Sequence, residues 1–168
     1  NLVLWSIEKT VKVVATIKAS PNEETVVNQI SFCPWDATLC VVIGKGFAKL
    51  FRIIENTFKP VALSVRRDHD NFISHCWLPD DILVLGTEKG EILLVEGGEY
   101  RGVIYPSSSG GGSSVSGGGS LLGDSNSVTG HGLGREETTP VYCLCPTSRG
   151  FCAGTVDGEV KLFERSTE

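Results

Sequence analysis

The sequence of 168 residues lacks several features that would define its class at once. It has no apolar run near the roughly 20 residues that a membrane-spanning helix needs, since runs such as LCVVIG have only the length of a strand. It has no basic start followed by an apolar core, the pattern of a signal peptide. It has no basic excess either: the formal net charge is -5, which argues against a protein that binds the phosphate backbone of nucleic acids.

Metal-binding spacing is also missing. The six cysteines include no C-x-x-C pair, and no H-x-x-x-H motif could complete a zinc site. Most of them stand in short apolar runs such as ISFCP and VYCLCP, where a free cysteine behaves as a small buried hydrophobic residue. We therefore expect reduced thiols in a core, no metal or cofactor, and a reducing, intracellular compartment.

Length and composition are those of one globular domain. The chain has 40% hydrophobic and 21% charged residues, which is ordinary for a folded protein. Because residue 1 is Asn rather than Met, we expect the native protein to begin upstream and this chain to be a fragment of it.

Three segments of the chain share one pattern. They are residues 26–53, 72–98 and 140–166. Each begins with a short apolar strand and a polar turn, continues with a second apolar strand that ends at a tight glycine turn, and closes with a third strand. A fourth strand fits between them, as in PVALSV and YRGVIYP.

The glycine turns give this pattern a physical basis. Gly46, Gly90 and Gly158 stand in GKG, EKG and VDG, where a hairpin needs a positive φ that glycine adopts without steric cost. Asp157, next to the last of these glycines, is predicted to stabilise its turn. We interpret all four as structural positions of the repeat rather than as catalytic, cofactor-binding or metal-binding residues.

The spacing of the repeats predicts the fold. The leucines that close the third strands are 46, 44 and 68 residues apart, at Leu4, Leu50, Leu94 and Leu162. The first two distances fit the period of roughly 40–45 residues of four-stranded WD40 blades. The third is about 24 residues longer, and the Gly/Ser-rich tract of residues 106–139 accounts for the excess. That tract is predicted to be a disordered insertion loop.

The predicted fold class is therefore all-β. Residues 1–168 are interpreted as part of one WD40 β-propeller, with about three to four four-stranded blades. An open array of blades would leave apolar faces and strand edges uncovered. We expect further blades outside this chain to cover them.

Three stretches also carry a family resemblance. The runs VVNQISFCPWDATLCVVIGKGFAKLFRI, NFISHCWLPDDILVLGTEKGEILLVEGGEYR and GFCAGTVDGEVKLFE resemble the axonemal WD-repeat family of cilia- and flagella-associated proteins. The resemblance implies a structural protein of the ciliary axoneme with two propellers followed by coiled coils. It also implies partners among the inner dynein arms, neighbouring regulatory complexes and the doublet microtubule. The Gly/Ser-rich insertion departs from the family, so no contact of that loop is inferred from it.

Candidate catalytic residues do not form a constellation in the sequence. The histidines are His69, His75 and His131. We interpret His75, in FISHCW, as a strand residue with a hydrogen-bond partner, and Trp77 in the same strand as a packing residue. Adjacent strand residues point to opposite faces, so His75 and Cys76 cannot act as a base and its nucleophile. No phosphate-binding motif is present, because GGGSSVSGGGS lacks the lysine and the strand-to-helix context that such a loop needs.

Two functions remain open from the sequence. The favoured one is a non-catalytic WD40 scaffold of the ciliary or flagellar axoneme that supports the assembly, docking or regulation of inner dynein arms. The alternative is a WD40 adaptor that binds peptides in another cytoplasmic complex. Neither involves nucleic acid or a membrane, and coiled-coil sequence downstream would favour the first.

Overall fold

The computed structural model describes residues 1–65, 70–106, 114–116 and 139–165, and all its regular structure is β-sheet. No helix among these residues is long and apolar enough to cross a membrane. The strands are β1 (Leu2–Ser6), β2 (Lys12–Ile17), β3 (Val27–Cys33), β4 (Asp36–Gly44), β5 (Phe47–Ile54), β6 (Thr57–Val61), β7 (Phe72–Leu78), β8 (Ile82–Thr87), β9 (Ile92–Glu96), β10 (Glu99–Tyr105), β11 (Ser114–Ser116), β12 (Val141–Pro146), β13 (Gly150–Thr155) and β14 (Val160–Glu164).

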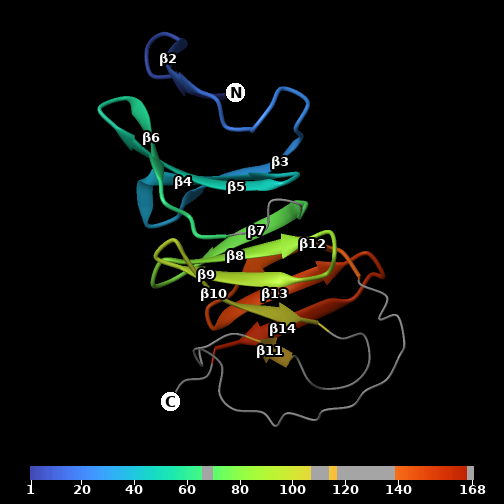
Figure 1. The fold of residues 1–168 in the computed structure, drawn as a ribbon. Helices are drawn as coiled ribbons and strands as arrows, with labels where there is room; N and C mark the ends of the chain where they lie inside the picture. The colour runs from blue at the N-terminus through green and yellow to red at the C-terminus, as the bar shows by residue number, and fades with distance from the viewer. Residues whose placement is uncertain (66–69, 107–113, 117–138, 166–168) are drawn as a thin grey trace.

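The described strands form four antiparallel sheets, each made of strands consecutive in the chain. We name them blade 1 (β1–β2), blade 2 (β3–β6), blade 3 (β7–β10, with β11 at its edge) and blade 4 (β12–β14). Figure 1 shows the blades following one another from the blue N-terminal end to the red C-terminal end. The expectation of an all-β, partial β-propeller is confirmed by this arrangement.

Glycine conformation sets the hairpins between the second and third strands of blades 2, 3 and 4. Gly46, Gly90 and Gly158 have φ angles of 75°, 78° and 78°. A side chain at such an angle would crowd the following carbonyl oxygen, so glycine lets the two strands turn back on each other without strain. These three hairpins bring the closing strands β5, β9 and β14 into register with β4, β8 and β13.

Blade 3 is buried on both faces, and this explains its continuous apolar runs. On β8, Leu83 and Leu85 pack toward blade 2, whereas the alternating Ile82 and Val84 pack toward blade 4. All four are buried. A strand covered on both sides needs apolar residues at every position, since successive side chains point to opposite faces.

The core is divided into three clusters, one at each junction between consecutive blades. The cluster between blades 1 and 2 is built around Phe47, Phe51 and Phe58. The clusters on either side of blade 3 join it to blades 2 and 4. Stability therefore resides in blade-to-blade contacts, so each blade depends on its neighbours for a core.

One short strand falls within the predicted insertion. β11 pairs antiparallel with β10, with Val115 opposite Ile104. It extends blade 3 to five strands. Residues 107–113 and 117–138 lie outside the described part of the chain, so the disorder of the insertion stays a prediction.

Candidate functional site

A polar network lies within the apolar junction between blades 2 and 3. The Nε2 atom of His75 on β7 is 2.6 Å from the Oγ atom of Ser31 on β3, and the Trp77 indole N–H donates to the same hydroxyl at 3.0 Å. The amide side chain of Gln29 accepts from the His75 backbone N–H at 2.8 Å. His75 is 2% exposed, and burial lowers its pKa to about 4. The ring is therefore neutral at physiological pH and joins two blades.

The segments that enter each blade lie over the glycine hairpins. Before β7, the backbone oxygen of Asp70 accepts from Gly46 N–H at 2.8 Å, and that of Asn71 accepts from Glu88 N–H at 2.9 Å. Each bond fixes the entry segment on a hairpin, the first on that of blade 2 and the second on that of blade 3. The Asp70 carboxylate also pairs with Lys89 at 2.6 Å, which adds a side-chain contact to the blade 3 hairpin.

The same arrangement recurs one blade further on. The Thr139 hydroxyl donates to the Asp157 carboxylate at 3.0 Å in the hairpin of blade 4. A Cβ atom at Gly90, in the hairpin of blade 3, would lie 2.6 Å from the Thr139 backbone oxygen. The segment that enters blade 4 is therefore in close contact with the hairpins of blades 3 and 4. At position 90 only glycine leaves room for this contact.

The structure distributes the four predicted turn positions along the array and does not bring them together. Gly46, Gly90 and the Asp157–Gly158 pair occupy hairpins of three successive blades. A Cβ atom at Gly90 would meet the Thr139 backbone, whereas one at Gly158 would meet nothing within 4 Å. The structural role of the four positions stays a prediction. His69 and His131 lie outside the described residues.

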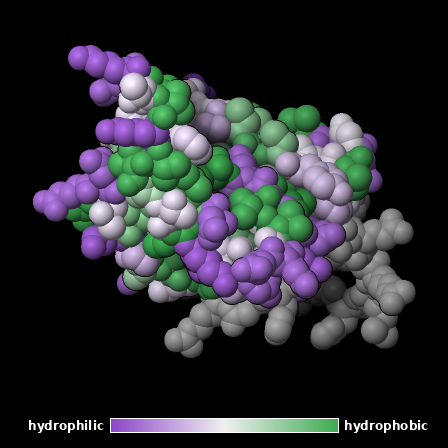
Figure 2. Space-filling view, turned by 90° about the horizontal axis from the view of Figure 1, so that it is seen from above, coloured by the Kyte–Doolittle hydropathy of each residue, from purple (hydrophilic) through white to green (hydrophobic). Residues whose placement is uncertain are grey.

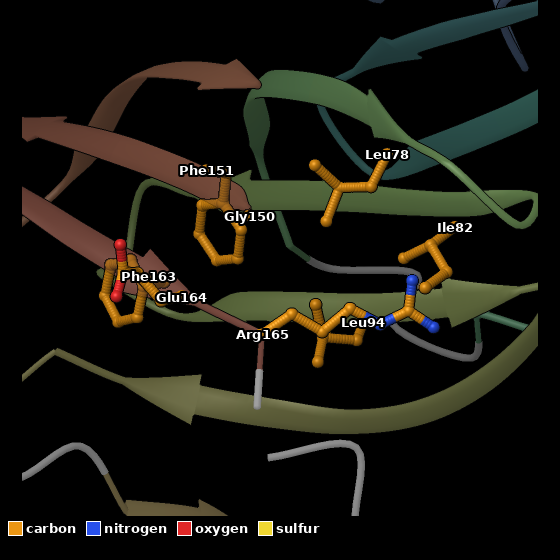
Figure 3. A pocket seen from close by; sticks show the side chains of 8 residues that line it. All are labelled: Leu78, Ile82, Leu94, Gly150, Phe151, Phe163, Glu164 and Arg165. Atoms are coloured by element: carbon orange, nitrogen blue, oxygen red, sulfur yellow. The ribbon is translucent and has the colours of Figure 1, made fainter. Parts of the chain in front are cut away.

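A narrow apolar slot opens between blades 3 and 4. Figure 3 shows its walls, which include Leu78 and Leu94 from blade 3 and Phe151 and Phe163 from blade 4. Phe151 and Phe163 are stacked with ring centroids 4.8 Å apart. Arg165 lies beside the slot, and its guanidinium pairs with Asp80 of blade 3 at 2.6 Å. The slot is a seam between two blades that one arginine bridges.

Apolar side chains remain exposed at both ends of the array. At the blade 1 end, Ile30 and Phe32 on β3 are each 45% exposed, although Val42 and Cys40, their partners across the ladder, are buried. Figure 2 views this end and shows apolar patches beside hydrophilic side chains. Single exposed apolar residues are ordinary, but such rows on one sheet face mark a contact surface.

At the other end, no residue that the structure describes covers the outer face of blade 4. Val160 and Leu162 on β14 are 75% and 61% exposed. The register places Leu162 opposite Cys152, as it places Leu94 opposite Val84 in blade 3. Leu94 is only 7% exposed, because blade 4 covers it.

The cysteines divide between these environments. Cys33, Cys40 and Cys76 are buried, as predicted, and burial raises the pKa of Cys40 to about 11 and that of Cys76 to about 12. The remaining three do not lie in a core: Cys143 and Cys145 are exposed and Cys152 is intermediate. All three are in blade 4, whose outer face no described residue covers. Among the described residues, no group of His, Cys, Asp or Glu is arranged to hold a metal ion.

These features define the class of the protein. Sheets of consecutive antiparallel strands, packed face to face with a core at each junction, are the blades of a partial β-propeller.

The comparisons identify what the chain is similar to. It is 29% identical, over its whole length, to cilia- and flagella-associated protein 57 of Mus musculus. It is 23% identical, over 82% of its length, to cilia- and flagella-associated protein 57 A of Tetrahymena thermophila. No protein-family model matches the chain.

These similarities confirm the family resemblance found in the sequence. The chain spans only 14% of the mouse relative and 9% of the Tetrahymena relative. It therefore corresponds to a small part of those proteins.

Proposed function

We propose that residues 1–168 are consecutive blades of one larger WD40-type propeller, with residues 106–139 as an insertion between blades 3 and 4. The exposed row on β14 supports this. Val160 and Leu162 occupy the places that Ile92 and Leu94 fill in blade 3, where they are 0% and 7% exposed. A further blade would bury them in the same way.

The propeller is proposed to act as a non-catalytic scaffold of the ciliary or flagellar axoneme. Its partners would be inner dynein arm components, neighbouring regulatory complexes and the doublet microtubule, and coiled coils outside this chain would anchor it. The observation that carries the proposal is the similarity to cilia- and flagella-associated protein 57 over the whole of this chain. A fold of stacked blades also suits the task, because it presents broad rigid surfaces.

The described side chains support a non-catalytic role. The buried histidine holds two blades together, and two of the buried thiols, Cys40 and Cys76, have raised pKa values and stay protonated. A thiol must be deprotonated to act as a nucleophile, so neither is activated for covalent catalysis.

Fractionation of demembranated cilia tests the scaffold proposal. The full-length protein should remain with the axoneme through detergent and leave it only in high salt or chaotrope. Its recovery in the detergent-soluble fraction, with none on the axoneme, would contradict the proposal and favour an adaptor in another cytoplasmic complex. An axonemal tubulin and a soluble ciliary protein, probed on the same samples, control for the completeness of extraction.

A further inference from the structure

A cleft of about 290 Å³ separates the outer strands of blades 1 and 2. Ile17 and Lys18 line it from the end of β2, whereas Phe51, Pro60 and Val61 line it from β5 and β6. β2 touches β6 beside the cleft, so the two blades already meet there. The cleft is therefore a gap within an established junction, unlike the open faces at the ends of the array.

A lysine stands in this junction where blade 3 has a buried leucine. Lys49 on β5 lies opposite Val42, and Leu93 on β9 lies opposite Leu85 in the same place of the next blade. Leu93 is 0% exposed and packs against blade 2. Lys49 is half-buried, lines the cleft and has its ammonium group 5.9 Å from the centre of the Phe47 ring. Lys161 on β14, opposite Ala153, holds the same place in blade 4, so blades 2 and 4 carry a lysine there and blade 3 a leucine.

The cations of the cleft contrast with those of blade 3. In blade 3, Lys89 pairs with Asp70 at 2.6 Å and Arg101 with Glu96 at 2.9 Å. No described carboxylate forms an ion pair with Lys18 or Lys49. Lys18 is exposed and Lys49 is half-buried, so both ammonium groups can pair with an anionic partner that enters the cleft.

We propose that this cleft binds an extended acidic segment of a partner protein, with its carboxylates on Lys18 and Lys49 and an apolar side chain against Ile17 and Pro60. Charge complementarity selects the partner, since the two ammonium groups favour carboxylates and repel basic segments. The apolar walls exclude water and strengthen these ion pairs. The cleft defines the chemistry of one partner of the scaffold proposed above. The cleft proposal depends on the scaffold proposal only for where that partner is found.

Binding of a defined probe to the full-length protein tests the site directly. The probe is a short fluorescein-labelled peptide of alternating glutamate and leucine, followed by fluorescence anisotropy. The Lys18→Glu/Lys49→Glu double variant should bind it about tenfold more weakly, a loss of about 1.4 kcal/mol. The matched control is Lys12→Glu/Lys59→Glu, which makes the same charge change on β2 and β6 outside the cleft and should leave binding unchanged.

Equal losses in the two double variants would overturn the proposal, because they would show attraction to overall charge only. The proposal would also be overturned if a lysine–leucine peptide, or inorganic phosphate, bound with the same affinity as the glutamate–leucine peptide. If charge reversal prevents folding, Lys18→Gln/Lys49→Gln serves instead, with the same expected direction and its melting temperature measured beside the wild type.

Zero-length carbodiimide cross-linking of isolated axonemes provides a second, separate test. It joins lysine amines to carboxylates in direct contact, so Lys18 and Lys49 should be linked to Asp or Glu of another polypeptide more often than Lys12 and Lys59. If the protein is found on axonemes but Lys18 and Lys49 are not linked more often than the control lysines, the cleft proposal is contradicted and the scaffold proposal is unaffected. A protein absent from axonemes contradicts the scaffold proposal, and the peptide measurement then decides the cleft alone.

Discussion

His75 and Ser31 face each other across the junction of blades 2 and 3, with the ring Nε2 atom 2.6 Å from the hydroxyl oxygen. The hydroxyl also accepts from Trp77, so one serine satisfies two side chains of the neighbouring blade. The Nδ1 atom of His75 has no hydrogen-bond partner among the described residues. A buried imidazole held in this way favours the neutral form, because a charged ring would lose its hydration without compensation.

The first prediction concerns the pH dependence of stability. His75 has a folded pKa of about 4 against an ordinary value of 6.5. Well above pH 6.5 the ring is neutral in both states and contributes no pH dependence. As the pH falls from 6.5 to 4, only the unfolded state binds the proton, so the free energy of unfolding should fall by about 3 kcal/mol.

Urea denaturation at several pH values measures this effect. The His75→Gln variant, which does not titrate in the window, should show a smaller decrease than the wild type between pH 6.5 and 4. Parallel slopes for the two proteins would mean that the ring is protonated in the folded state. The comparison uses slopes, so a constant loss of stability in the variant does not affect it.

The second prediction separates two ways in which replacing a glycine lowers the free energy of unfolding: backbone strain at a positive φ, and a clash with a neighbouring segment. Gly90 and Gly158 both have a φ of +78°, but only Gly90 has a neighbour in the way, since a Cβ atom there would lie 2.6 Å from the Thr139 backbone oxygen. Gly158→Ala should cost about 1 kcal/mol from backbone strain alone. Gly90→Ala should cost roughly 1 kcal/mol more, because backbone must move.

Thermal or urea unfolding of the two variants provides the measurement. Gly158→Ala is the internal control, since it carries the same φ in open space. Equal costs for both variants would show that the Thr139 segment does not rest on the blade 3 hairpin.

Much of this architecture could be predicted from the sequence, because it depends on local rules. A glycine in a hairpin with positive φ and an alternation of apolar residues with period two are both readable in a single strand. The spacing of the closing leucines Leu50 and Leu94 then gave the blade period. His75 is a strand residue with a hydrogen-bond partner and Trp77 is a packing residue, as the sequence predicts.

The rest depends on contacts between blades, which no local pattern reports. Lys49 reads in the sequence as an ordinary polar residue of a half-buried strand, and only its register shows that it replaces a buried leucine. Cys143 and Cys145 look like core residues in VYCLCP, yet they are exposed because their blade has no described neighbour on that side. No local sequence pattern predicts that Ser31 is a hydrogen-bond partner, since the residue that it contacts, His75, is 44 positions away.

The third prediction concerns Asp36, the first residue of β4. Hydrogen bonds from the Thr38 hydroxyl and backbone N–H, and from Arg52, lower the pKa of its carboxyl group to about 2. The carboxylate therefore favours the fold above its ordinary pKa of 3.8, and this contribution is lost as the pH falls toward 2. The group is exposed, so the observable is its titration rather than global stability.

Carbon-detected NMR can follow that titration. Thr38→Ala should raise the pKa of Asp36 more than Arg52→Met does, because the hydroxyl bond is the largest cause of the shift. The reverse order would show that charge attraction to the guanidinium, 2.6 Å away, dominates instead.

The fourth prediction tests whether another blade covers blade 4 in the full-length protein. Leu94→Ala removes a buried side chain from the junction of blades 3 and 4 and should cost about 3 kcal/mol. Leu162 holds the corresponding place on β14, so Leu162→Ala should have a similar cost if a further blade packs there. The matched control is Val156→Ala, because Val156 in the blade 4 hairpin is 57% exposed, close to the 61% of Leu162. Urea unfolding of the three variants measures the loss of unfolding free energy in each. If Leu162→Ala loses as little as Val156→Ala, the outer face of blade 4 is exposed to solvent in the full-length protein. The propeller would then end or open at β14.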